Sequence, residues 1–392
     1  MASGTRQGML QLDRTIEERL VQNRRDLHAN PELSGKEIET AHYLAERLDA
    51  LGVDELRTDV GGTGVVADIK GSRPGRTVLL RADMDALPIQ EIGDLPFKST
   101  RLGVMHACGH DVHMTIALNL AEAFARNRDA FSGRVRFVFQ PAEERGCGAK
   151  PMIDAGILEG VDRVIGLHVW SELPTGHVSV RPDVVMASAD MFTLTITGKA
   201  GHGAQPDRTI DAVMIAAQVV TAMQTLISRE TSPRDSAVIT IGSLHAGTAS
   251  NIVAGEAVLE GTLRTFDKQL RDRLLRRIAE LADGVCRAMR AGCAFRLDSE
   301  TPPVVNDPAV AELVAGEARK LLGGDAVVPF SPLMVGEDFA YFLESRPGCF
   351  FLLGGAPEGE PAVHHTPGFR IDEGCLAIGY RVMGAAILAL LA

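Results

Sequence analysis

The sequence predicts an α/β protein in which a sheet domain covered by helices is split by a smaller, inserted α+β domain. Three observations support this fold class. Short apolar runs alternate with helical patterns at the start of the chain. This alternation of predicted strands and helices stops near residue 187 and resumes from about residue 302. A chain of 392 residues is also too long for one ordinary hydrophobic core, so two domains are expected.

The part before residue 187 opens with two helices and continues as strands that alternate with helices. Asp13 fits a helix N-cap, and Gly52 fits the end of the second helix. A helix through TIALNLAEAFARN separates the second strand candidate from the third. The strand candidates are the apolar runs TGVVADI, TVLLRADM, RVRFVFQ and RVIGLHVW. In such sheets ligands bind beyond the carboxyl ends of the strands.

The part from 187 to 301 predicts a compact unit of its own, with the strand-helix-strand-strand-helix order of a ferredoxin-like domain. MFTLTITG alternates like a half-buried strand, and long helices are expected at about 209–229 and 267–290. AVITIGSLHA and EAVLEGTLRTF form the strands between the helices, and Cys293–Leu297 supplies a further one. The proline pair in SETPPVVND marks the exit. The predicted boundaries are therefore 1–186 with 302–392 for the sheet domain, and 187–301 for the inserted domain.

Composition and charge restrict the class of partner. A hydrophobic content of 45% and a charged content of 23% are typical of a globular protein. The net charge of -11 disfavours nucleic acid, whose binding depends on clustered Lys and Arg. Six scattered cysteines without a CxxC pair favour a reducing compartment, and neither a secretory signal nor an uninterrupted apolar run of about 18 residues is apparent. We expect a cytoplasmic protein that acts on a small molecule, without nucleic-acid or membrane partners.

Five short motifs carry chemically active side chains, most of them after a predicted strand or in a loop. MHACGHDVHM is the densest, because it places Cys108, His110 and His113 within ten positions. Any one motif alone has an ordinary structural explanation, such as a polar strand end or a solvated pair of acids. The other four motifs are RADMDALP with Asp83 and Asp85, QPAEE with Glu143 and Glu144, GLHVW with His168, and VHHTPGF with His364 and His365.

Together these residue types favour a metal site. Thiolate, imidazole and carboxylate ligands suit zinc, manganese, cobalt or nickel, whereas calcium and magnesium prefer oxygen ligands almost alone. A metal-free amidase that uses Cys108 as its nucleophile with His110 is an alternative. That alternative leaves the consecutive glutamates and the dispersed histidines without a role. Metal-assisted hydrolysis therefore fits the motifs better.

In this order, the motifs closely resemble those of the M20 metallopeptidase clan. The set is completed by AGHGAQP, SNIVAGEAVLEGTLRT and VGEDFAYF, and the resemblance runs from about residue 17 to 385. It is strongest to the amidohydrolase subfamily, which contains hippurate hydrolases, hydrolases of auxin-amino-acid conjugates and N-acyl-amino-acid deacylases. The peptidase branch carries a histidine where this chain has Asp83 and an aspartate where it has Cys108, so the thiolate subgroup is the one that is matched.

The resemblance implies a centre of two divalent metal ions (Zn, Mn, Co or Ni) in the sheet domain. Glu143 then matches the general base of the family. Asp85 matches a residue that contacts and orients a metal ligand without binding the metal itself. His365 is preferred to His364 as a ligand, because the family ligand immediately precedes a Thr-Pro or Ser-Pro pair. The implied ligands are Cys108 as the bridge, with His110, Glu144, His168 and His365.

The resemblance also assigns roles to the inserted domain. His202 matches a residue that stabilises the oxyanion, and Asn251 and Arg264 match contacts to the carboxylate of the substrate, which a guanidinium can bind in a fork. The implied reaction is cleavage of an N-acyl-amino acid to a carboxylic acid and a free amino acid. The alternatives are a di- or tripeptidase or a carboxypeptidase of the same clan, and a non-catalytic binding protein, which the presence of Glu143 disfavours.

A homodimer is the expected assembly, with the inserted domain as its lid and dimerisation domain. In related enzymes of this layout the histidine at the position of His202 can serve the active site of the other subunit. The strands around MFTLTITG and EAVLEGTLRTF are expected to offer the pairing edge. The other possibility is a monomer in which His202 serves the metals of its own chain.

Overall fold

A computed structural model describes residues 8–359 and 363–392 and divides the chain into two compact units. The sheet unit runs up to Val185 and continues through Val305–Ser331 and Asp338–Ala392. The inserted unit comprises Met186–Val304 and the short segment Pro332–Glu337. The chain passes between the units through β7 (Val184–Met186) and β14 (Val304–Val305).

The segment Pro332–Glu337 differs from the predicted boundaries, which assigned it to the sheet domain. The Ala187 N–H donates a hydrogen bond to the Leu333 carbonyl at 2.9 Å, and Met186 forms a parallel bridge with Leu333. Backbone pairing therefore attaches this segment to the first residues of the inserted unit. Neither partner has a side-chain pattern that would reveal the pairing in the sequence.

Among the described residues, the sheet unit is built on a seven-stranded sheet with the order β1-β2-β4-β3-β5-β15-β6. The inner strands β4, β3, β5 and β15 are mutually parallel, and β1, β2 and β6 pair in antiparallel fashion at the two sides. The strands are β1 (Glu55–Val60), β2 (Gly64–Lys70), β3 (Arg73–Asp83), β4 (Ser132–Gln140), β5 (Arg163–Pro174), β6 (Val178–Ser179) and β15 (Gly348–Ala356).

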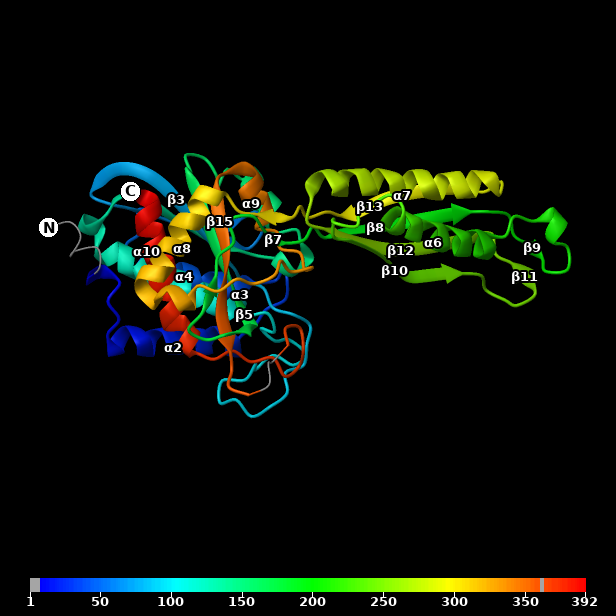
Figure 1. Cartoon of the computed structure of the whole chain (residues 1–392). Coiled ribbons are helices and arrows are strands. Elements are labelled where there is room, and N and C mark those ends of the chain that lie inside the picture. Colours follow the sequence, from blue (N-terminus) through cyan, green and yellow to red (C-terminus); the bar gives the residue numbers. More distant parts are fainter. Residues whose placement is uncertain (1–7, 360–362) are drawn as a thin grey trace. The chain divides into compact units, whose positions relative to one another are not determined.

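Helices cover this sheet, and α4 and α10 both contact β3. In Figure 1, α8 and α10 lie side by side, and the two helices are in contact. The helices of the unit are α2 (Arg14–Ala29), α3 (Ile38–Ala50), α4 (His110–Arg126), α5 (Ala149–Asp154), α8 (Pro308–Leu322), α9 (Ala340–Ser345) and α10 (Gly374–Leu391), with the single 3-10 turns η1 (Arg128–Ala130), η2 (Glu143–Arg145) and η4 (Gly324–Ala326). The sheet with its helical cover confirms the predicted α/β class.

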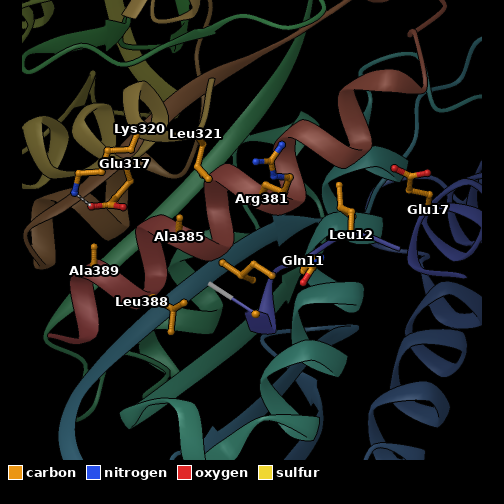
Figure 2. Close-up of a pocket in the computed structure, with 12 residues that line it drawn as sticks. Gln11, Leu12, Glu17, Glu317, Lys320, Leu321, Arg381, Ala385, Leu388 and Ala389 are labelled. Atoms are coloured by element: carbon orange, nitrogen blue, oxygen red, sulfur yellow. Dashed lines mark hydrogen bonds and ion pairs between the residues drawn. The ribbon is translucent and has the colours of Figure 1, made fainter. Parts of the chain in front are cut away.

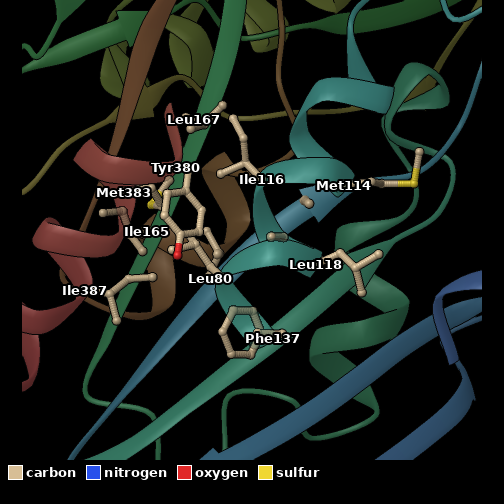
Figure 3. Packing of buried hydrophobic residues seen from close by; sticks show 14 of the residues in the cluster. Leu80, Met114, Ile116, Leu118, Phe137, Ile165, Leu167, Tyr380, Met383 and Ile387 are labelled. Atoms are coloured by element: carbon tan, nitrogen blue, oxygen red, sulfur yellow. The ribbon is translucent and has the colours of Figure 1, made fainter. Parts of the chain in front are cut away.

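The last helix, α10, is apolar on nearly all sides because it belongs to the core. By length and composition alone it could cross a membrane, but 67% of its apolar window is buried in the protein. Figure 3 shows Tyr380, Met383 and Ile387 of α10 packed with Leu80 of β3 and Ile165 of β5. A helix that is hydrophobic all round is expected at such a buried position.

Among its described residues, the inserted unit contains a four-stranded antiparallel sheet with the order β10-β12-β8-β13. The helices α6 and α7 pack on this sheet. This strand order is that of a ferredoxin-like domain, as predicted. Asp211 and Asp267 cap the two helices by accepting backbone N–H bonds. The elements are β8 (Asp190–Thr197), β9 (Gly201–His202), η3 (Pro206–Arg208), α6 (Ala212–Ser228), β10 (Ala237–Ala246), β11 (Ile252–Val253), β12 (Glu256–Thr265), α7 (Lys268–Ala288) and β13 (Gly292–Ser299).

The predicted pairing edge of the inserted unit is wrong. MFTLTITG forms β8 and EAVLEGTLRTF forms β12, and these are the two inner strands of the sheet. Each already pairs on both sides, so neither has free backbone groups to offer to a second copy. The edge strands of this sheet are β10 and β13. Alternation of polar and apolar residues identifies a strand, but it does not give the order of strands in a sheet.

Candidate metal centre

The chemically active side chains that the motifs of the sheet unit carry come from different strands but meet at one edge of the sheet. Asp83 is the last residue of β3, Glu143 and Glu144 lie in the turn η2 just after β4, and His168 lies on β5. His365 follows β15. The carboxyl ends of parallel strands lie side by side, which explains how residues that are far apart in the sequence form one cluster.

Cys108 lies at the centre of this cluster. Its Sγ is 3.4 Å from Nε2 of His168 and 3.3 Å from Nε2 of His365. The same nitrogen of His365 is 3.2 Å from Oε1 of Glu144. Burial, followed by the negative charge of Glu144, raises the pKa of the Cys108 thiol well above its usual value. A coordinated cation would favour the thiolate, since metal ions deprotonate the thiols that bind them.

His110 is the first residue of α4 and presents one ring nitrogen to the cluster. Its Nδ1 donates to the Asp85 carbonyl at 2.8 Å, while its Nε2 lies 3.9 Å from Oε1 of Glu144 and 4.0 Å from Oε2 of Glu143. Burial disfavours protonation of His110, but the charge of Asp83 and the hydrogen bond with Asp85 outweigh it and raise its pKa to about 10. The surrounding carboxylates therefore create a potential that favours a cation.

Two atoms of this cluster support the fit of a metal ion. In residues 8–359 and 363–392, His110 Nε2 and Glu144 Oε1 are buried and make no hydrogen bond of acceptable geometry, although Glu144 lies close to His365. Buried polar atoms normally have a hydrogen-bond partner, so the lack of one at these two atoms needs an explanation, and a bound metal ion would supply it. Three of the groups able to hold an ion share members, as two adjacent metal positions require: Cys108 with His110 and His168, Cys108 with Glu144 and His365, and His110 with Glu143 and Glu144.

The two consecutive histidines near the C-terminus have different surroundings. His364 Nε2 donates to the Val169 carbonyl at 3.2 Å, and its Nδ1 accepts from the Ser171 hydroxyl at 3.0 Å. The ring also stacks on Trp170, with centroids 4.4 Å apart. Both nitrogens of His364 are therefore in use. The side chain that reaches Cys108 is His365.

The backbone of His365 has φ +60°, in the left-handed region that few residues other than glycine adopt. Its N–H donates to the Ala107 carbonyl at 2.9 Å, which fixes the turn against the segment that carries Cys108. Backbone strain of this kind persists where the surroundings impose it, often at functional sites. The strained turn directs the imidazole of His365 toward Cys108 and Glu144.

Gly109 makes the close approach between Cys108 and β5 possible. Its φ is +92°, and a Cβ atom at this position would lie 2.3 Å from Cγ1 of Val169. Any other residue would meet both backbone strain and a steric clash. Gly109 is also the N-cap of α4, so the chain can turn between Cys108 and His110 and direct both side chains into the cluster.

Asp85 contacts two members of the cluster, Glu144 and His110. Its Oδ2 accepts from the Glu144 N–H at 3.1 Å and from the Ser34 hydroxyl at 2.6 Å. Its carbonyl receives the hydrogen bond from His110 Nδ1, and its Oδ1 lies 3.2 Å from the same nitrogen. Because Nδ1 of His110 makes this bond, Nε2 is the nitrogen whose electron pair is available to a metal ion, the arrangement that metal-binding histidines commonly show.

A buried ion pair behind the cluster was not identified from the sequence. Arg81 Nη2 donates to Oδ1 of Asp338 at 2.9 Å, and the Gln140 amide donates to the same carboxylate at 2.8 Å. Asp338 Oδ2 also accepts the N–H groups of Gly148 and Ala149, just after the turn that carries the two glutamates. The sequence does offer one indication of this ion pair. Asp338 is an acidic residue inside the apolar motif VGEDFAYF, and no role was assigned to it from the sequence.

The predicted site residues of the inserted unit do not all lie together. His202 of β9 pairs with Ile252, and Gly203 donates to the Asn251 carbonyl at 2.8 Å, so His202 and Asn251 are neighbours. Arg264 is near the far end of β12, eight residues beyond the first residue of that strand, or about 26 Å at about 3.3 Å per residue. Within this unit, Arg264 is therefore remote from the other two.

A cavity of about 830 Å³ lies elsewhere in the sheet unit, between the segment before α2, α8 and α10. Figure 2 shows that Leu12, Leu321, Arg381 and Leu388 contribute to its walls. The residues that line it include none of the predicted site residues. The chemistry of this protein is therefore to be sought at the donor cluster.

A set of thiol, imidazole and carboxylate donors at the carboxyl edge of a parallel α/β sheet, buried except at its exposed member His365, is typical of a metal-dependent hydrolase. Comparison with known proteins identifies the family. The family described as Peptidase family M20/M25/M40 matches residues 79–389. The chain belongs to this family, and within it to the amidohydrolases.

Several relatives resemble the chain over most of its length. Thermostable carboxypeptidase 2 of Saccharolobus solfataricus is 40% identical, with 96% of this chain and 95% of the relative covered. N-acyl-L-amino acid amidohydrolase of Geobacillus stearothermophilus is 45% identical over 72% of this chain and 76% of the relative. The crystal structure of the Bacillus subtilis YXEP protein, a dinuclear metal binding peptidase of the M20 family, has a TM-score of 0.84 and 35% identity, covering 97% of this chain and 99% of that one.

Proposed function

We propose that this protein hydrolyses N-acyl-amino acids to a carboxylic acid and a free amino acid, with two divalent metal ions. The observation that carries the proposal is the position of the Cys108 sulfur, which is within 3.4 Å of two imidazole nitrogens. A thiolate there can bridge two cations. The name of the Geobacillus stearothermophilus relative supports the substrate class. The proposed ligands are Cys108, His110, Glu144, His168 and His365.

Bound ions would supply Lewis-acid polarisation of the scissile carbonyl and acidify the attacking water. Glu143 would take the proton of this water and pass it to the leaving amine, acting first as general base and then as general acid. It shares the turn η2 with the proposed ligand Glu144 and is buried, with 9% exposure. His202 would donate to the developing oxyanion. Arg264, together with Asn251 of a second copy because the two are remote within one unit, would bind the carboxylate of the amino-acid part.

A cysteine-nucleophile amidase has less support. A nucleophilic cysteine needs an accessible thiol with a lowered pKa. Burial instead raises the pKa of Cys108, and the thiol lies between the imidazoles of His168 and His365. A carboxypeptidase remains the second candidate, because a 40% identical relative carries that name.

The test is an amine-release screen of the full chain loaded in turn with Mn, Co, Zn or Ni. The substrates are acetyl-, benzoyl- and indoleacetyl-amino acids, with dipeptides and C-terminally extended peptides for the second candidate. We expect release from N-acyl-amino acids, loss of activity after dialysis against a chelator, and recovery when metal is added. Activity that survives chelation would contradict a metal mechanism. Preference for peptides would favour the carboxypeptidase.

A further inference from the structure

Asp83 lies in the donor cluster, but both of its oxygens are already in use. Oδ1 is 2.6 Å from Nδ1 of His113, and Oδ2 accepts from Nη1 of Arg81 at 2.5 Å. The carboxylate is fully buried. Each oxygen keeps a further lone pair, but a cation bound there would lie next to the Arg81 guanidinium, which repels it. Asp83, His110 and His113 lie close enough together to form a donor group, but the existing bonds of Asp83 and the neighbouring charge of Arg81 disfavour Asp83 as a ligand.

The hydrogen bonds of His113 determine its tautomer. The Val169 N–H donates to His113 Nε2 at 2.9 Å, so this nitrogen carries no proton. The ring proton must then be on Nδ1, which donates it to Asp83. Both nitrogens of His113 are occupied, and this histidine of the predicted cluster has no free electron pair for a metal.

The chain of contacts from Asp83 ends at the proposed ligand His168. The Val169 N–H binds His113, and the carbonyl of the same residue accepts from His168 Nδ1 at 2.7 Å. The Nδ1 proton of His168 is thereby fixed, and its Nε2 faces Cys108. The rings of His113 and His168 also meet edge to face, with centroids 4.7 Å apart.

We propose that Asp83 and His113 are a positioning pair that sets the orientation of His168 and so the affinity of the metal position that includes it. Arg81 holds Asp83, Asp83 orients His113, and His113 anchors the backbone next to His168. This inference rests on the proposed two-metal centre. It gives Asp83 a role that differs from direct ligation, even though its oxygen lies 3.7 Å from His110 Nε2.

The test is a titration of the metal-free full chain with Co²⁺, followed by the thiolate-to-cobalt charge-transfer band, the ligand-field bands and the bound metal after dialysis. We expect wild type to bind two equivalents. His113→Ala should bind one equivalent tightly and the other about 10- to 100-fold more weakly, the usual effect of losing an outer partner of a metal ligand. Asp83→Asn should show a smaller loss, because its amide oxygen can still accept from His113. Asn119→Ala is the matched control, since Asn119 is a buried polar residue on the same helix whose amide donates to the Thr115 carbonyl of that helix.

Unchanged affinities and bands in His113→Ala would overturn the proposal. A larger loss in Asp83→Asn than in His113→Ala would also overturn it, because Asp83 would then be a direct ligand. If His113→Ala does not fold, His113→Leu takes its place, because it fills the volume but cannot accept from the Val169 N–H, and two wild-type affinities in that variant refute the pair. A wild-type protein that binds no cobalt contradicts the two-metal centre itself, which separates the failure of the proposed function from the failure of this inference.

Discussion

Glu143 and Glu144 are adjacent, yet the proposed function gives them different roles. Glu144 is a metal ligand and Glu143 is the general base. Both lie near His110 Nε2, at 3.9 Å for Glu144 and 4.0 Å for Glu143, but Glu144 also lies 3.2 Å from His365 Nε2. Consecutive residues of a 3-10 turn project in different directions, so one can bind a cation while its neighbour handles a proton. The two positions can therefore be separated by mutation.

We expect Glu143→Gln to keep its bound metal and to lower turnover by about 10²- to 10⁴-fold, the usual contribution of a general acid-base group. Glu144→Gln, the comparison variant, should instead lose metal. Metal content by elemental analysis and turnover on one N-acyl-amino acid check both variants. Near-normal turnover in a fully loaded Glu143→Gln protein would remove the residue from proton transfer.

Cys108→Ala should lower metal occupancy, because a bridging thiolate neutralises two cations and its loss leaves both with an open coordination position. Cys147→Ala is the matched control, since Cys147 is exposed and follows the turn η2. Elemental analysis after dialysis gives the occupancy of each variant. Two full equivalents in Cys108→Ala would show that the sulfur is not a ligand.

Single residues of the cluster could be predicted from the sequence where a motif carried them, but their connections could not. The choice of His365 over His364 depended on its neighbours Thr366 and Pro367, and only the contacts of the two rings explain it. The pairing of Arg81 with Asp338 joins residues 257 positions apart. The tautomer of His113 depends on a backbone N–H of another strand. No local pattern encodes either contact.

At the level of elements, a buried ion pair connects the first strand of the inserted unit to its second helix. Arg271 of α7 binds Asp190 of β8 through Nε and Nη2, at 2.6 to 3.0 Å. Asp190 is fully buried, and burial raises its pKa despite the guanidinium. Removing one partner of such a pair costs more than the pair itself contributes, because the other charge remains buried.

Arg271→Ala should therefore destabilise the protein by about 3–5 kcal/mol, the range for a broken buried ion pair. Arg287→Ala on the same helix breaks an exposed pair with Asp283 and should cost about 0–1 kcal/mol. Urea denaturation of the full chain, followed by circular dichroism, compares the two variants. Equal shifts of the transition would contradict the special weight given to Arg271.

Strand and helix types were predictable from periodicity, and the order of strands was not. The runs TGVVADI, TVLLRADM, RVRFVFQ and RVIGLHVW form β2, β3, β4 and β5. The inner strand β15 was not singled out, because a short apolar run of this kind does not distinguish a strand from a buried helix. The positions of β8 and β12 inside their sheet depend on pairings between distant segments, which periodicity does not record.

For the whole molecule, the distance between His202 and Arg264 suggests how many chains build one active site. Arg264 lies about 26 Å along β12 from Glu256, the end of the strand that follows β11 and its pairing with His202, and a small N-acyl-amino acid cannot contact both His202 and Arg264 in the same copy. We therefore expect a homodimer in which His202 and Asn251 act on the site of the partner. An edge strand of the inserted unit, β10 or β13, is the candidate for the pairing.

Mixing two inactive variants tests this arrangement. A heterodimer of Glu143→Gln with His202→Ala contains one site with an intact Glu143 from one chain and an intact His202 from the other. Recovered activity, up to about half that of the wild-type dimer, is expected if His202 acts across the interface. In that heterodimer, purified with two different tags, a lack of recovery would place His202 in the site of its own chain.

His202 lies in the strand pair of β9 with β11, remote from Arg264 of the same unit. This separation also has a consequence for how the activity depends on the amount of protein. If each site needs a residue from a second chain, isolated chains are inactive, and the subunit equilibrium becomes part of the rate law. Below the dimer dissociation constant, the rate would rise with the square of the protein concentration. A cell could then change the output of this enzyme more than in proportion to the number of chains it makes.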